Sequence, residues 1–131
     1  MVKGAVIDEE ASHPLRFSKA QRLTRPAEFL RVKSDGQTRR GALMVLAVLE
    51  LQTKEATAFR AGFVTSKRLG GAVVRNRVRH RLREIVRRHQ HAVRGGIWIV
   101  IIARPAAARA SYGALEDEWL RLAKRAFILA P

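Results

Sequence analysis

The residues that decide the fold are AFRAGFVTSKRLGGAVVRNRVRHRLREIVRRHQHAVRGGIWIVIIAR, positions 58–104. Apolar runs at 58–66 and 97–104 have the length and composition of β-strands. Between them, apolar residues recur at helical spacing over 72–94, and two glycines follow that can end a helix. A connection of this length can join two parallel strands, so the stretch predicts a strand–helix–strand unit. The apolar positions of the predicted helix are Val74, Val78, Leu82, Ile85 and His89.

The flanking sequence adds three more elements. Residues 25–34 predict a short helix, because a threonine can cap it, a proline suits its first turn and a glycine can end it. Residues 42–51 are continuously apolar. Their periodicity alone does not exclude a helix, but turn residues on both sides favour a strand, paired with 58–66 as an antiparallel hairpin. Residues 111–127 predict a last helix whose acidic and basic residues match the helix dipole.

The order α-β-β-α-β-α predicts an α+β fold, a two-layer sandwich in which helices pack on a small mixed sheet. The chain has 131 residues, an ordinary size for one domain. We expect a single domain at 22–131 and an irregular N-terminal segment at 1–21, where no hydrophobic period is clear. Trp98 and Trp119 are interpreted as core anchors. The absence of cysteine excludes disulfides, thiolate zinc sites and cysteine nucleophiles.

Charge is the first indication of function. Lys and Arg number 26 against 11 acids, which gives a net charge of +15. Such an excess repels itself, and a polyanion would relieve it, with nucleic acid the first candidate and an anionic membrane the second. The predicted helix at 72–94 holds eight arginines against one acid, Glu84. Four of these arginines follow one another at i, i+4, so they predict a ridge of like charge that an external anion would stabilise. They are Arg75, Arg79, Arg83 and Arg87.

Other classes of function are less well supported. The longest apolar run, 97–103, is too short to span a bilayer, and acidic residues stand where a signal peptide needs apolar ones, so we expect a cytoplasmic protein. No pairing of nucleophile and base can be found, and the histidines at 80, 89 and 91 have simpler structural explanations, so no catalytic or metal-binding residue is predicted. A ribosomal or architectural RNA- or DNA-binding protein would explain the charge equally well. A binder of anionic membranes or acidic proteins is the other alternative, but the sheet would bury the apolar face of its helix.

One segment resembles a known signature. FVTSKRLGGAVVRNRVRHRLRE, residues 63–84, is similar to the pattern of the bacterial ribonuclease P protein family, in which Ser-Lys-Lys/Arg, Gly, Ala-Val and Arg-Asn-Arg follow in fixed register. Segments 22–36 and 97–108 resemble the first helix and last strand of that family, so the resemblance covers about 22–127. The matched positions are Ser66, Lys67, Arg68, Gly70, Ala72, Val73, Arg75, Asn76, Arg77, Val78, Arg79, Arg83 and Glu84.

The resemblance implies a function that spacing alone does not show. It implies the protein subunit of ribonuclease P, a ribonucleoprotein endoribonuclease that removes the 5′ leader from precursor tRNA. The RNA subunit would carry the chemistry, with magnesium bound mainly by that RNA. The implied partners are ribonuclease P RNA and precursor tRNA, with no membrane and no small-molecule substrate. The resemblance also implies a left-handed strand–helix–strand crossover, against the usual hand.

The resemblance also assigns surfaces residue by residue. Arg75, Asn76, Arg77, Arg79 and Arg83 would face the catalytic RNA. Ser66, Lys67 and Arg68 would contact RNA phosphates. Arg22, Phe29 and Lys33 would belong to a leader cleft between the first helix and the sheet. Phe29 would stack on a base there, and plain core packing is a comparable interpretation of that residue.

Three positions depart from the family pattern. His80 replaces a basic residue, and Lys33 and Ala47 stand where many members carry aromatics. We therefore expect a leader cleft that relies less on stacking and more on charge.

Overall fold

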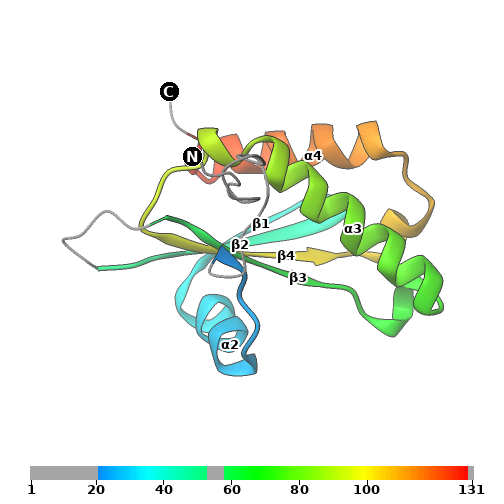
Figure 1. Ribbon diagram of the computed structural model, residues 1–131, viewed down its shortest axis with the longest axis horizontal. Helices are drawn as coiled ribbons and strands as arrows, with labels where there is room; N and C mark the ends of the chain where they lie inside the picture. Colours follow the sequence, from blue (N-terminus) through cyan, green and yellow to red (C-terminus); the bar gives the residue numbers. More distant parts are fainter. Residues whose placement is uncertain (1–20, 53–57, 130–131) are drawn as a thin grey trace, which may run out of the picture.

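The computed structural model describes residues 21–52 and 58–129 (Figure 1). The prediction about segment 1–21 lies, except for Gln21, outside the described residues. Three short 3₁₀ turns, Lys67–Leu69, Gln90–Ala92 and Pro105–Arg109, connect the larger elements. In chain order the helices and strands are α2 (Pro26–Asp35), β1 (Gln37–Arg40), β2 (Met44–Glu50), β3 (Arg60–Val64), α3 (Ala72–Arg88), β4 (Ile97–Ala103) and α4 (Tyr112–Arg125).

The four strands form one mixed sheet in the order β1-β2-β4-β3. Strands β3 and β4 are parallel neighbours, so the predicted strand–helix–strand unit is confirmed. The predicted hairpin of 42–51 with 58–66 is wrong, because β4 lies between β2 and β3 and pairs with β2 in antiparallel register. Strand β4 is apolar on both faces, and all its residues are buried except Trp98 and Ile102, which are partly exposed.

Strand β1 was not predicted, because its sequence, QTRR, has no apolar residue. It pairs with β2 from Gln37↔Val48 to Arg40↔Val45, and only Arg39 is partly buried. The hydrogen bonds of the ladder, and not apolar burial, therefore define this edge strand.

Helix α3 ends at Arg88, earlier than the glycines at 95 and 96 suggest. His89 closes the helix, and its ring stacks on Trp119 with 5.8 Å between ring centroids. Beyond it, buried Val93 forms a bridge with Leu129. Gly96 has φ +74 and turns the chain into β4, so the glycines serve the strand instead of the helix.

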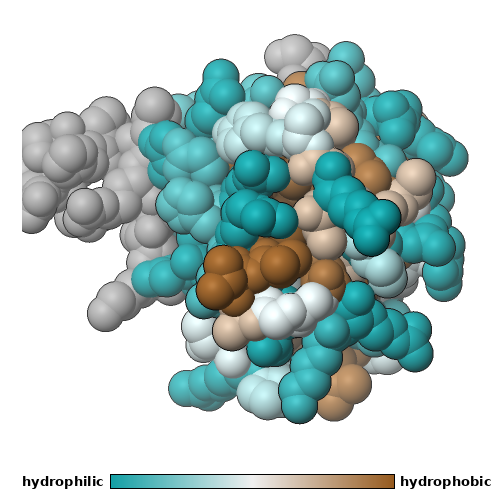
Figure 2. All heavy atoms as spheres, turned by 90° about the vertical axis from the view of Figure 1, so that its right-hand side faces the viewer, coloured by the Kyte–Doolittle hydropathy of each residue, from teal (hydrophilic) through white to brown (hydrophobic). Residues whose placement is uncertain are grey.

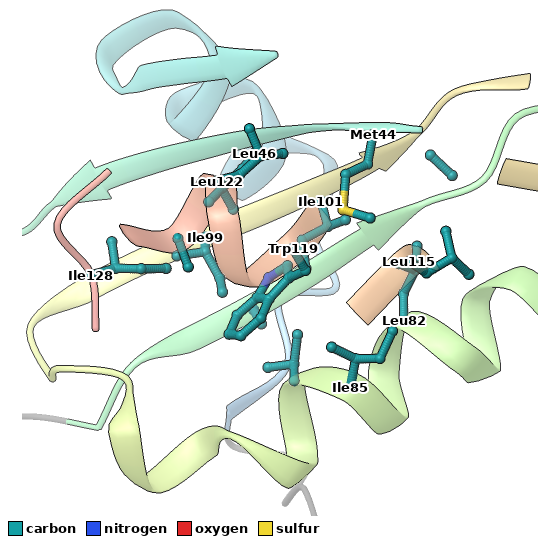
Figure 3. Close-up of a cluster of buried hydrophobic side chains, with 14 of the residues drawn as sticks. Met44, Leu46, Leu82, Ile85, Ile99, Ile101, Leu115, Trp119, Leu122 and Ile128 are labelled. Carbon is teal, nitrogen blue, oxygen red and sulfur yellow. The ribbon is translucent and has the colours of Figure 1, made fainter. Parts of the chain in front are cut away.

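The helices and the mixed four-stranded sheet confirm the α+β class. They do not form the predicted two layers, because helices cover both faces of the sheet. Helix α2 lies on one face, and α3 and α4 lie on the other (Figure 1). The larger core is on the α3/α4 face, where Trp119 is fully buried among side chains of the sheet and both helices (Figure 3). Each large apolar side chain buried there contributes about 1.5–3 kcal/mol. The labelled members include Met44, Leu46, Leu82, Ile85, Ile99, Ile101, Leu115 and Leu122.

The face under α2 holds a smaller core. Its buried members are Leu23, Val32, Ala47, Leu49 and Val100. Trp98 packs against this core but is only partly buried, so it borders the core and is not enclosed by it. Within the described ranges, no helix is long and apolar enough to cross a membrane.

Candidate nucleic-acid interface

The loop from β3 into α3 holds two cations away from the core. Leu69 is buried and anchors the 3₁₀ turn, while Lys67 and Arg68 are exposed. Gly70 has φ +141, a conformation that side chains with a Cβ rarely adopt, and it packs against Val74. The loop thus presents its cations beside the N-terminus of α3, where the helix dipole also favours an anion.

Helix α3 carries its arginines on both sides of a buried stripe. Val78, Leu82, Ile85 and Val86 make the stripe that packs on the sheet. On one side, Arg77 donates to the Ala108 carbonyl at 3.0 Å and Arg81 to the Ala110 carbonyl at 3.1 Å. Asn76, Arg77 and His80 are exposed, so they lie on the outer surface of the helix.

The other side of α3 faces the edge of the sheet at β3. Arg79 donates to the Thr65 hydroxyl and, at 3.1 Å, to the Asn76 side-chain oxygen. The Arg83 guanidinium lies 5.7 Å from the centre of the Phe63 ring. Arg79 therefore has neutral partners that fix its position without cancelling its charge, and among the described residues Arg83 has no acidic partner.

Positive charge converges at Arg83. Its burial lowers the pKa of the guanidinium, and Arg22 and Arg79 lower it further by repulsion. The Nε atoms of Arg22, Arg75 and Arg83 are buried without a hydrogen-bond partner in the described part of the chain. Because Arg22, Arg79 and Arg83 repel one another, an external oxyanion bound at this cluster would offset the repulsion. Arg22, which was expected in the cleft, is thereby placed beside the arginines of α3.

The C-terminal half of α3 differs, because acids compensate its cations. Arg87 pairs with Glu84; the bond raises the pKa of Arg87 and lowers that of Glu84. Arg88 lies 3.5 Å from the Glu116 carboxylate. The predicted ridge of like charge is therefore interrupted at Arg87, and in the described part of the chain the uncompensated arginines of α3 precede Glu84.

Phe29 and Lys33 lie on the α2 face of the sheet. A Cβ on Gly62 would come within 2.5 Å of the Phe29 ring, so the ring packs directly on β3. Lys33 is exposed one turn further along α2. Ala47 is fully buried under the helix. An aromatic at position 47 would therefore need α2 to move.

A strip of sheet stays partly open beside α2. Val45, Ile102 and Val64 are paired across β2, β4 and β3 in one row, and all three are partly exposed. Figure 2 shows the end of the molecule where α3 begins and β4 ends, with hydrophobic side chains gathered among hydrophilic ones. Val73, at the start of α3, is 79% exposed.

Glu118 was not identified from the sequence. It was interpreted as part of a helix-dipole pattern, but it is only 4% exposed and lies against the turn between β1 and β2. Its carboxylate accepts hydrogen bonds from the backbone N–H groups of Ala42, Leu43 and Met44, at 3.1, 2.7 and 2.9 Å. Nothing in the local sequence distinguishes it from Glu116 or Asp117, which are more exposed.

Comparison with known proteins gives a consistent result. A family model described as Ribonuclease P matches residues 17–127. The ribonuclease P protein component of Roseiflexus castenholzii is 38% identical over 114 residues, covering 86% of this chain and 91% of the relative. That of Symbiobacterium thermophilum is 40% identical over 113 residues, covering 86% and 96%.

Solved structures agree in fold. The RNase P protein of Staphylococcus aureus matches with a TM-score of 0.77 and 28% identity, covering 85% of this chain and 99% of that one. The RNase P protein of Thermotoga maritima matches with a TM-score of 0.70 and 26% identity, covering 79% and 96%.

Proposed function

This chain belongs to the ribonuclease P protein family, and from that premise we propose that it binds the catalytic RNA with α3 and the 5′ leader of precursor tRNA with the α2 face of its sheet. Membership makes it a protein component of a ribonucleoprotein endoribonuclease that processes tRNA, with RNA as its partner. The two surfaces extend that assignment to individual side chains.

The uncompensated charge at the start of α3 carries the first half of the proposal. Arg75 and Arg83 have buried Nε atoms without partners in the described residues, and Asn76 and Arg77 are exposed beside them. Phosphate oxygens of the catalytic RNA would bind the guanidinium groups of this surface and offset the repulsion among the arginines. Lys67 and Arg68, with the Ser66 hydroxyl, would extend the contact along the backbone of the RNA.

The open strip beside α2 supports the second half. Phe29 offers an aromatic edge, Lys33 a cation, and the row through Ile102 an apolar floor on which bases of a single strand can lie. Arg22 lies at the β3 edge of the sheet, through its backbone bridge to Ala61, and its charge acts on Arg83 of α3. It would bind a phosphate where the leader and the catalytic RNA approach each other.

The reaction itself would belong to the RNA subunit. We propose that magnesium is bound mainly by that RNA, and that the protein lowers the magnesium requirement by neutralising phosphates. In the described part of the chain, no three His, Asp or Glu side chains gather as a metal site. We further propose that the holoenzyme works in the cytoplasm.

A salt titration of binding tests the α3 surface. The variant Arg75→Ala/Arg77→Ala/Arg79→Ala should bind the catalytic RNA more weakly, and its plot of log affinity against log salt should be shallower by about 0.7–0.9 per lost phosphate contact. The matched control, Arg121→Ala/Lys124→Ala/Arg125→Ala, removes the same charge from exposed positions on α4. Equal losses in both variants would show that general charge, and not α3, binds the RNA.

A further inference from the structure

Trp98 is the aromatic residue that the proposed function leaves unused. It lies partly buried on the α2 face of the sheet. The Arg31 guanidinium is 5.4 Å from the centre of its ring, and the Arg60 guanidinium is 5.2 Å away. A tryptophan in contact with two arginines at the surface of an RNA-binding protein is chemically suited to a nucleobase.

Trp98 lies across α2 from the proposed leader strip. In the sheet it pairs with Leu49 and Arg60, whereas Ile102 of the strip pairs with Val45 and Val64. The row between them, which contains Val100, is buried beneath α2. The two sites thus share one face of the sheet and are separated by the helix.

The two arginines at Trp98 are held differently. Arg60 is fixed, because it donates to the Glu28 carboxylate at 2.6 Å and to the Arg22 carbonyl at 3.0 Å. Burial raises the pKa of Glu28, but hydrogen bonds from Arg25 and Arg60 outweigh it, so the pKa is lowered and the ion pair is kept. One cation at the ring is therefore part of the folded structure.

Arg31 has no such fixation. Arg31 is exposed, and its guanidinium contacts the ring of Trp98. In the described part of the chain, this guanidinium makes no hydrogen bond or ion pair. Glu28, one turn earlier on α2, is already paired with Arg60. Arg31 can therefore leave the ring without breaking an ion pair to any described residue, and its N–H donors can then bind a phosphate.

We propose that Trp98 and Arg31 form a second nucleotide site, at which an unpaired RNA base stacks on the tryptophan and Arg31 binds the adjoining phosphate. The proposal rests on the proposed function, since it requires single-stranded RNA at this face. It also agrees with the departures at Lys33, on α2, and Ala47, beneath it, where many members of the family carry aromatics. Trp98 supplies stacking where those positions do not.

Tryptophan fluorescence of the full chain tests this site. The protein has two tryptophans, and Trp119 is fully buried, so quenching by a stacked base reports on Trp98. Titration with a single-stranded RNA oligonucleotide of leader sequence should quench the emission. Because variants at Trp98 lack this reporter, their affinity is measured by fluorescence anisotropy of the labelled oligonucleotide. By that measurement Trp98→Leu should weaken the binding by about 5- to 150-fold, the value of one stacked base, whereas Trp98→Phe should keep most of it. Arg31→Gln should weaken binding, and Lys124→Gln, an exposed cation on α4, serves as its matched control.

The RNA that supplies the stacked base is identified by comparing the quenching caused by different RNAs. Quenching by precursor tRNA but not by mature tRNA assigns the base to the leader, and quenching by the catalytic RNA alone assigns it to that RNA. The site would be overturned if RNA saturated the protein without changing the tryptophan emission and Trp98→Leu bound RNA with unchanged affinity. That result would leave the proposal for the α3 surface intact. Absence of RNA binding in the wild type would overturn both proposals.

Discussion

Glu118 stabilises the turn that carries the basic edge of the sheet. It accepts hydrogen bonds from three consecutive N–H groups, and Arg121 lies 3.3 Å from its carboxylate. Removing the carboxylate leaves those donors unsatisfied next to the core, which costs about 1–3 kcal/mol for a buried group. We therefore expect Glu118→Ala to lower the free energy of unfolding by about 2–4 kcal/mol in urea denaturation. The exposed neighbour Asp117→Ala should change it little, and equal effects of the two substitutions would refute this role.

Two carboxylates predict how stability depends on pH. The bond from Arg87 lowers the pKa of Glu84 below its ordinary 4.5. Glu28, despite its burial, also has a lowered pKa because Arg25 and Arg60 donate to it. The unfolded chain thus binds more protons in acid, so this stability is present above pH 4.5 and is lost as pH falls through the lowered values.

The test compares the acid limb of stability in two variants. Glu28→Gln and Glu84→Gln should each flatten the fall of the unfolding free energy below pH 4.5. An acid limb identical to that of the wild type would mean that these carboxylates titrate normally in the folded protein.

The contacts of single residues could not all be predicted from the sequence. The spacing of arginines along 72–94 located the basic helix, but spacing does not show that Glu84 forms an ion pair with Arg87. Likewise, the continuous run of apolar residues around Trp98 predicted a buried strand. The contacts with Arg31 and Arg60 depend on how α2 crosses the sheet, which no local pattern encodes.

At the scale of elements, the position of α2 on the sheet depends on the contact between Phe29 and Gly62. A Cβ at position 62 would come within 2.5 Å of the ring. We expect Gly62→Ala to destabilise the protein by about 1–3 kcal/mol, as overpacking does. Phe29→Leu should relieve part of that cost, so the double variant should lose less than the sum of the single variants. Strict additivity in a double-mutant cycle of urea unfolding would show that the ring does not pack on Gly62.

Element types were predictable where apolar periodicity was strong, as in α3, α4 and β4. The partner of each strand was not, because pairing β2 with β4 joins residues about fifty positions apart, and the hairpin rule considers only neighbours in sequence. Strand β1 carries no apolar signal, so only the hydrogen bonds to β2 reveal it.

At the scale of the whole molecule, the stability of the folded state depends on the net positive charge. The chain has an excess of +15, and the arginines of α3 before Glu84 contribute to it, whereas acids compensate the end of that helix. A polyanion that binds only the folded state should therefore stabilise it, by about 2.7 kcal/mol at a hundred times its Kd. Thermal or urea unfolding with a short RNA, against sodium chloride of equal ionic strength, measures the effect. A gain no larger than that of the salt would mean that screening alone relieves the repulsion.

Cleavage of precursor tRNA by the cognate catalytic RNA at low magnesium tests the central claim most directly. The wild-type protein should stimulate removal of the 5′ leader, and Arg75→Ala/Arg77→Ala/Arg79→Ala should not, while the triple variant on α4 keeps the stimulation. A wild-type protein that binds RNA in a salt-dependent way, yet gives no stimulation, would contradict the account.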